Sequence, residues 1–191
     1  MRLIPRCALA AALVAAIASP VVAQQAAPAA APGDLVGDLL IDIGQAEQKI
    51  MGLARTIPAD KCGWRPGEGV RSVCEVLLHI AADNYLLPGL QGHALDASLG
   101  IKPEDYKTVQ AFETRKLSRE ATIAELERSF AFLKKSLTAT DVSRLPNKIS
   151  AFGQTMTSQY LWVSTATHLH EHLGQLIAYA RSNGVKPPWG I

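Results

Sequence analysis

Residues 167–175 read Thr167-His168-Leu169-His170-Glu171-His172-Leu173-Gly174-Gln175, with apolar and polar side chains at helical spacing. On an α-helix, residues four apart share one face, with Cβ atoms about 5–6 Å apart. At about 100° per residue, His172 lies about 40° from His168, and Gln175 and Tyr179 lie within about 20° of it. His170 lies about 200° away, on the opposite side. The pattern therefore predicts a polar stripe on a helix that is otherwise expected to pack in a core.

A third histidine lies in another apolar helical run. His79 is the only polar residue of residues 76–82, Val-Leu-Leu-His-Ile-Ala-Ala. Three neutral imidazole nitrogens around one ion, with a coordination position left open, are typical of a catalytic metal site. We therefore predict that His79, His168 and His172 are metal ligands. His170 and His93, which lies in a glycine-flanked loop, are expected to be solvated or interface histidines instead.

Three further polar residues are candidates to support these ligands. Glu75 and Asp83 lie four residues before and after His79, and Gln175 lies on the stripe with His168. A histidine that binds a metal usually donates its second N–H to a carboxylate or another acceptor. Each carboxylate also has a simpler interpretation, because Glu75 can cap a helix and Asp83 can lie on a solvated face. Glu75, Asp83 and Glu171 are all candidates for a general base, and the spacing selects none of them.

Four amphipathic segments predict an all-α protein, a four-helix bundle with long crossover connections. They begin after the candidate caps Asp34, Ser72, Ser118 and either Thr155 or Thr157. The first three segments end near Pro58, at Pro88-Gly89 and before Asp141, and the fourth ends near Asn183-Gly184. Residues 90–117 are ambiguous, with the start of a short helix at residues 103–106. No strand-like alternation is visible, so residues 141–153 are expected to form a loop. Facing helices of such a bundle can build a metal site in its interior.

The first residues resemble a secretory signal peptide. Basic residues precede an apolar run, and Val21-Val22-Ala23 forms a small-residue cleavage pattern. Residues 1–23 are therefore a predicted signal peptide, residues 24–33 a disordered lead-in, and residues 34–191 a single domain. The mature protein is expected to be periplasmic or secreted, with no membrane span. Loss of Arg2 and Arg6 lowers the basic count from 19 to 17, equal to the 17 acidic residues. This balance argues against a nucleic-acid partner.

Two cysteines remain after cleavage, Cys62 and Cys74. In an oxidising compartment they could form a disulfide across a short loop. The alternative is a loop Cys62 and a Cys74 that packs as a small apolar side chain. Spacing alone does not establish the geometry of the bond, so both interpretations stay open.

Four segments of the chain resemble the DinB-like (DinB/YfiT-type) metal-binding four-helix superfamily. They are residues 64–73 (WRPGEGVRSV), 75–81 (EVLLHIA), 168–176 (HLHEHLGQL) and 184–188 (GVKPP). The resemblance spans nearly the whole mature chain in the expected order. It implies a divalent ion, often zinc or nickel, held by one histidine of the second helix and two of the last. Those positions fall on His79, His168 and His172. The family includes thiol-dependent transferases and isomerases.

Two functions follow as hypotheses, and the sequence does not decide whether the protein is an enzyme. A metal-dependent hydrolase or thiol-dependent transferase would act on an unknown small molecule bound at the open coordination position. The alternative is a non-catalytic periplasmic module that binds a metal or a ligand, and a homodimer through helix faces is compatible with both. In a third interpretation the histidines are only buried polar groups, each of which would need hydrogen-bond partners.

Overall fold

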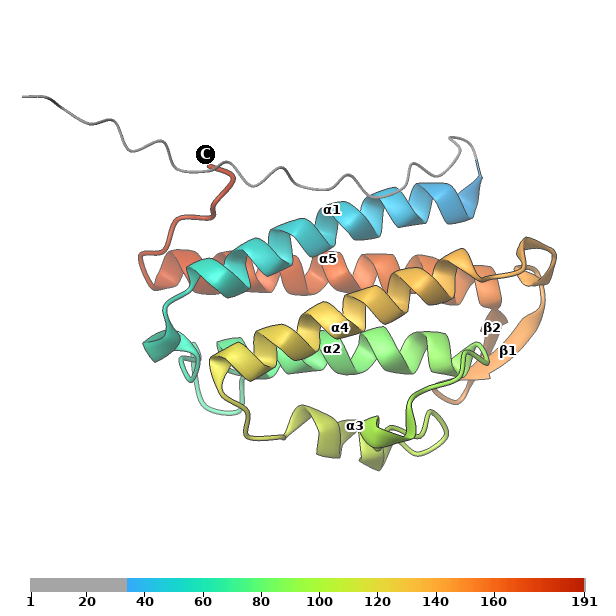
Figure 1. Ribbon diagram of the computed structural model, residues 1–191, viewed down its shortest axis with the longest axis horizontal. Coiled ribbons are helices and arrows are strands. Elements are labelled where there is room, and N and C mark those ends of the chain that lie inside the picture. Colours follow the sequence, from blue (N-terminus) through green and yellow to red (C-terminus); the bar gives the residue numbers. More distant parts are fainter. Residues whose placement is uncertain (1–33, 191) are drawn as a thin grey trace, which may run out of the picture.

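The computed structural model of the chain describes residues 34–190, so the predicted signal peptide and lead-in lie outside the described residues. Four long helices form the bundle (Figure 1): α1 (Leu35–Thr56), α2 (Val73–Leu90), α4 (Arg119–Thr138) and α5 (Ser158–Ser182). A shorter helix, α3 (Tyr106–Glu113), lies in the connection between α2 and α4. The predicted all-α, four-helix architecture is confirmed. No helix in residues 34–190 has the length and apolar character needed to cross a bilayer.

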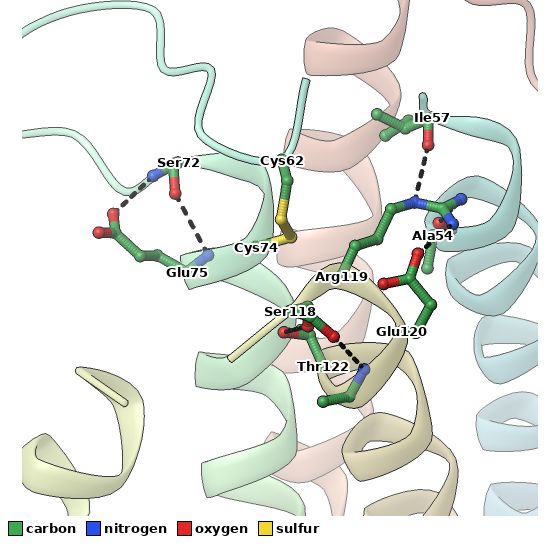
Figure 2. The surroundings of a disulfide bond; sticks show 11 residues. Ala54, Ile57, Cys62, Ser72, Cys74, Glu75, Ser118, Arg119, Glu120 and Thr122 are labelled. Carbon is green, nitrogen blue, oxygen red and sulfur yellow. Dashed lines mark hydrogen bonds and ion pairs between the residues drawn. A yellow bond between two sulfur atoms is a disulfide. The ribbon is translucent and has the colours of Figure 1, made fainter. Parts of the chain in front are cut away.

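Each long helix begins at a cap that the sequence indicates. The side chains of Asp34, Ser118 and Thr157 accept hydrogen bonds from the backbone N–H groups of Gly37, Ala121 and Tyr160. Ser72 and Glu75 form a reciprocal capping box at the start of α2, as Figure 2 shows. These side chains satisfy donors that the first helical turn leaves unpaired. Local sequence therefore decides where the long helices of the bundle begin.

The order of the helices explains the long crossover. Helix α1 packs against α4 and α5, and α2 packs against the same two helices. Neighbouring α2 and α4 run in the same direction (Figure 1), so the chain must return along the bundle between them. Residues 91–118 make that return, and α3 packs against α2 on the way. Helix α2 is consequently buried on nearly all sides, which explains why its apolar residues exceed a single stripe.

The predicted end of the second helix at Pro88-Gly89 lies within one residue of the end of α2 at Leu90. One detail of the sequence-based expectation is wrong. The predicted loop 141–153 contains strand β1 (Lys148–Ala151), which pairs antiparallel with β2 (Gln154–Thr157). The turn between them has Phe152 and Gly153 at φ 53° and 71°, the left-handed pair typical of a tight hairpin. Strand β1 (Lys-Ile-Ser-Ala) alternates polar and apolar residues, but four residues give only a weak signal, and β2 (Gln-Thr-Met-Thr) has a single apolar residue.

A disulfide joins Cys62 to Cys74, whose Cα atoms lie 5.0 Å apart, and resolves the alternative that the sequence leaves open. The bond ties the loop before α2 to the first turn of that helix (Figure 2). Nearby, the Arg119 guanidinium donates to the backbone carbonyls of Ala54 and Ile57 at the end of α1. The start of α4 and the end of α1 are thus held together at the same end of the bundle. The loop fixed by the disulfide carries Arg71, which supports the site described next.

Candidate metal centre

The three predicted ligands meet between α2 and α5. His79 Nε2 lies 3.2 Å from His168 Nε2, which in turn lies 2.9 Å from His172 Nε2. One ligand nitrogen from each of the three side chains lies within 4.8 Å of the others. Nitrogens about 2.1 Å from a tetrahedral ion would be about 3.4 Å apart, so these separations are close to those of a bound set. The structure therefore brings together the residues that the sequence singles out.

A carboxylate fixes the tautomer of His79. Its Nδ1 lies 2.8 Å from Glu113 Oε1, and the other oxygen of Glu113 accepts from Arg71 Nη2 at 2.9 Å. Burial alone would raise the pKa of Glu113, but the bonds to His79 and Arg71 lower that pKa overall. An ionised carboxylate can only accept, so His79 Nδ1 carries the proton. In the neutral ring, Nε2 then presents a lone pair to the other two histidines.

A chain of hydrogen bonds fixes the tautomer of His172. Tyr179 donates its hydroxyl to the backbone carbonyl of Arg71 at 3.1 Å, because a carbonyl can only accept. The Tyr179 oxygen then accepts from Gln175 Nε2 at 2.9 Å. This turns Gln175 Oε1 toward His172 Nδ1 at 2.8 Å, so that Nδ1 is the protonated nitrogen. The lone pair of His172 Nε2 therefore also points into the cluster.

With these two tautomers, the three Nε2 atoms have too few protons for a hydrogen bond in each of their two close contacts. His168 Nε2 faces the lone pairs of both His79 and His172, and a neutral imidazole has at most one proton there. At least one of the two close nitrogen pairs therefore has no hydrogen between its atoms. Burial first, and then the neighbouring His172 and His79, lower the pKa of His168 to about 3. An extra proton on His168 thus does not resolve the mismatch at neutral pH, whereas a divalent transition metal ion fits the three nitrogen donors.

Asp83 adds an oxygen to this cluster. Its Oδ2 lies 3.1 Å from His168 Nε2 and 3.6 Å from His79 Nε2. Burial raises the pKa of Asp83 to about 6, against the opposing effect of His79. The predicted neighbour of His79 therefore lies beside two ligand nitrogens. At that position it can complete a coordination sphere or exchange a proton with a bound molecule.

A cavity of about 390 Å³ opens beside His168 and Asp83. Its walls come from α5, from Leu87 of α2 and from the hairpin, which contributes Phe152 and Met156. Glu171 lies on the same wall. This volume lies within the range of small-molecule sites, which are about 300–1,000 Å³. The cluster is therefore accessible to a small ligand from one side.

The remaining predicted residues lie elsewhere. The Glu75 carboxylate accepts from the Ser72 backbone and from Arg65, so it caps α2 and does not support His79. His170 pairs at 3.0 Å with the half-exposed Asp42 of α1, in agreement with its place on the opposite face. His93 packs edge-on against Trp162, with ring centroids 5.9 Å apart. Glu171 does not contact the histidines but lines the cavity.

Two supporting residues escape the sequence analysis. Glu113 is the last residue of α3, in a segment that the sequence leaves ambiguous, and it lies 34 positions from His79. Arg71 supports the partners of both His79 and His172. Its guanidinium donates to Glu113, and its backbone carbonyl accepts from the Tyr179 hydroxyl. A clue to Glu113 is that it ends a short amphipathic pattern on its buried side. No local signal indicates Arg71.

Comparisons with known proteins agree with the four-helix fold. The DinB superfamily model matches residues 43–176. A DinB-like protein from Bacillus cereus superposes with a TM-score of 0.64 at 14% identity, covering 80% of this chain and 95% of its own. YfiT from Bacillus subtilis, described as a probable metal-dependent hydrolase with an unusual four-helix bundle topology, gives 0.62 at 12% identity, covering 86% and 97%.

A third solved structure belongs to an enzyme of a different kind. A mutant of a mycothiol-dependent maleylpyruvate isomerase gives a TM-score of 0.59 at 15% identity, covering 74% of this chain and 60% of its own. At such identities the structural likeness shows the fold and not the reaction. No curated protein sequence matches the chain significantly.

Proposed function

Because the chain belongs to the DinB superfamily, we propose that it is a metal-dependent hydrolase of a small molecule, with His79, His168 and His172 as its metal ligands. The observation that carries this proposal is the shortage of protons among the three Nε2 atoms. The bonds of Glu113 to His79 and of Gln175 to His172 place the proton of each ring on Nδ1. The Nε2 atoms of His79 and His172 therefore present lone pairs to His168 Nε2, at 3.2 and 2.9 Å. A cation between the three nitrogens removes this mismatch, because each lone pair then faces a positive charge.

The residues around the cluster support a hydrolytic reaction. When bound, a divalent ion supplies Lewis acidity and lowers the pKa of a coordinated water. The hydrogen bonds on the Nδ1 atoms of His79 and His172 orient both rings, so that each Nε2 faces the cluster. Asp83 lies where the cavity meets the cluster, so its carboxylate is placed to accept a proton from a nucleophile. The apolar walls from Leu87 and Met156 limit the access of bulk water to this point.

Metal analysis of protein purified without an affinity tag tests the first step. We expect about one divalent transition metal ion per chain, released by a chelator and restored by zinc or nickel. Hydrolysis of a panel of small ester and amide substrates should fall and recover with the ion. If the protein holds no ion after incubation with either metal, it is not a metal-dependent enzyme and the proposal is wrong.

A specific observation also favours a non-catalytic metal-binding module. Asp83 Oδ2 lies close enough to His79 and His168 to become a fourth protein ligand, which would close the coordination sphere. The visible spectrum of the Co²⁺-substituted protein separates the two functions. If the sphere is open, added azide should shift the absorption bands. If Asp83 closes it, azide should leave them unchanged in the native protein and shift them in Asp83→Asn.

Export is a further part of the proposed function. We propose that residues 1–23 are removed and that the enzyme acts in the periplasm or outside the cell. The disulfide between Cys62 and Cys74 supports this proposal, because such bonds persist in oxidising compartments. Mass spectrometry of the protein recovered from the periplasmic fraction should find Gln24 as the first residue. Intact Met1 in the cytosolic fraction would contradict it.

A further inference from the structure

A second cavity is lined by residues at the end of the bundle that carries the hairpin. Figure 1 shows the position of the hairpin, β1 and β2, at this end. It has a volume of about 380 Å³ and is lined by the end of α2, the loop after α4, strand β1 and the start of α5. It shares no lining residue with the cavity beside His168. The hairpin lies between them, with Lys148 of β1 on this cavity and Met156 of β2 on the other. The two cavities are therefore separate places for a ligand.

Two buried donors on this cavity have no partner. Within residues 34–190, Trp162 Nε1 and Gln91 Nε2 are the buried side-chain nitrogen and oxygen atoms without a hydrogen bond. Trp162 is fully buried, and Gln91 uses its oxygen to accept from the Ser158 hydroxyl. Both residues line the cavity. A buried polar group without a partner costs about 1–3 kcal/mol, so two at one cavity indicate a missing acceptor.

The chemistry of the missing group follows from the cavity lining. Both unpartnered atoms are N–H donors, so the occupant must supply acceptors. Arg144 and Lys148 line the cavity and have no ion pair within residues 34–190, while Asp141 is engaged by Ser143. Burial and then the Arg144 charge lower the pKa of His93. Its ring is consequently neutral at neutral pH. Hydrogen bonds from Ser143, and then the Arg144 charge, lower the pKa of Asp141, so its carboxylate stays negative. The charges of Arg144 and Lys148 outweigh this one, so the lining has a net positive charge.

We propose that this cavity is a second ligand site that binds a small organic carboxylate. The carboxylate oxygens accept hydrogen bonds from Trp162 Nε1 and Gln91 Nε2. Arg144 and Lys148, both exposed at the rim, supply the complementary charge. The site does not depend on the metal centre, because it shares no residue with it. The protein would thus recognise two small molecules, one on each side of the hairpin.

The indole N–H signal of Trp162 gives a direct test. The chain has three tryptophans, so a ¹⁵N-labelled sample shows three indole signals. Trp64→Phe and Trp189→Phe identify the other two signals, and phenylalanine keeps an aromatic ring at position 64, which packs on the core and against Tyr179. We titrate the full mature protein with succinate at constant ionic strength, and in parallel with succinamide, its neutral analogue of the same shape. Succinate should move the Trp162 proton signal downfield and to saturation, and succinamide should bind at least about tenfold more weakly.

Arginine variants test the role of charge. Arg144→Gln should weaken succinate binding by at least about tenfold, because it removes a charged partner from the rim. Arg181→Gln is the matched control, since Arg181 is exposed about 28 Å along α5 from Trp162. Lys148→Gln provides the same test at a second position if the first variant is poorly folded. The proposal is overturned if the Trp162 signal does not saturate, if succinamide binds as well as succinate, or if both rim variants bind like Arg181→Gln.

Discussion

Two buried polar clusters lie against α2, and they differ in the balance between donors and acceptors. The first, the Glu125 cluster, joins Glu125 of α4 to Tyr85, Arg115 and Arg128. The carboxylate oxygens accept from the Tyr85 hydroxyl at 3.0 Å, from Arg115 at 3.0 Å and from Arg128 at 3.1 Å. Each donor has its acceptor, and the two arginines lead outward to solvent. This cluster is complete without a ligand.

The second, the histidine cluster, is formed by His79, His168 and His172 with Asp83. Its outer bonds to Glu113 and Gln175 are as regular as those around Glu125. Its inner nitrogens, however, face one another with too few protons to join them. Both clusters hold charged or polar groups in a largely apolar interior. Burial of polar groups therefore does not by itself indicate a site, whereas an imbalance of donors and acceptors does.

The strongest way to break the comparison is to remove an inner nitrogen. His168→Ala should abolish stoichiometric metal binding and any hydrolytic activity, because two imidazoles alone form a weak site. The bundle should stay folded, since the caps and the apolar core are unchanged. Metal analysis and circular dichroism measure both effects. His170→Ala is the matched control and should keep its metal, because His170 lies on the opposite face of α5. Equal metal content in the two variants would show that the histidine cluster is not the site.

A milder change removes one outer bond. Glu113→Gln leaves the three ligand nitrogens in place but weakens the hold on His79 Nδ1 and frees Arg71. We expect metal affinity to fall by about 10–100-fold, the range typical of residues that orient a ligand. A competition titration with a chromophoric chelator measures the change. Glu68→Gln, at an exposed position in the loop before α2, should leave the affinity unchanged.

The complementary change is made in the Glu125 cluster. Glu125→Ala removes the shared acceptor and leaves the Tyr85 hydroxyl without its partner. The free energy of unfolding should fall by about 1–3 kcal/mol, less than for a fully buried ion pair because Arg115 and Arg128 can reach water. Urea denaturation measures this loss. Metal content should not change, and a loss of metal would mean that the two clusters are coupled.

The smallest expected effect is a pH dependence that belongs to the Glu125 cluster. Burial would raise the pKa of Glu125, but the bonds from Arg115, Arg128 and Tyr85 lower it below its ordinary value of 4.5. Since the folded protein binds this proton less readily than the unfolded chain, the cluster stabilises the fold above about pH 4.5. That contribution is lost as the pH falls through the lower pKa of the folded state. The stability difference between the native protein and Glu125→Gln should therefore shrink as the pH falls, and a constant difference would refute this account.

Local sequence patterns predict the long helices of the fold well. The caps Asp34, Ser72 and Ser118 each act within three residues, so the sequence alone indicates where α1, α2 and α4 begin. The four-residue spacing of His168 and His172 likewise fixes their common face on α5. The β-hairpin is missed because the alternation in β1 covers only four residues, the shortest length that indicates a strand, and β2 does not alternate. The hairpin is stabilised by contacts with Leu87 and Leu161, which are distant in the sequence.

Which side chains pair with one another across the bundle depends on contacts between segments that are distant in the sequence. The sequence alone determined the helices, their caps, the polar stripe of α5 and the isolated His79, because each of these follows from residues a few positions apart. Only the tertiary structure decided that Glu113 and not Glu75 holds His79, that Arg71 supports the partners of both His79 and His172, and that Cys62 is bonded to Cys74. The physical reason is the parallel packing of α2 and α4. It forces a long return of the chain, and α3 on that return carries Glu113 to a helix 34 residues away.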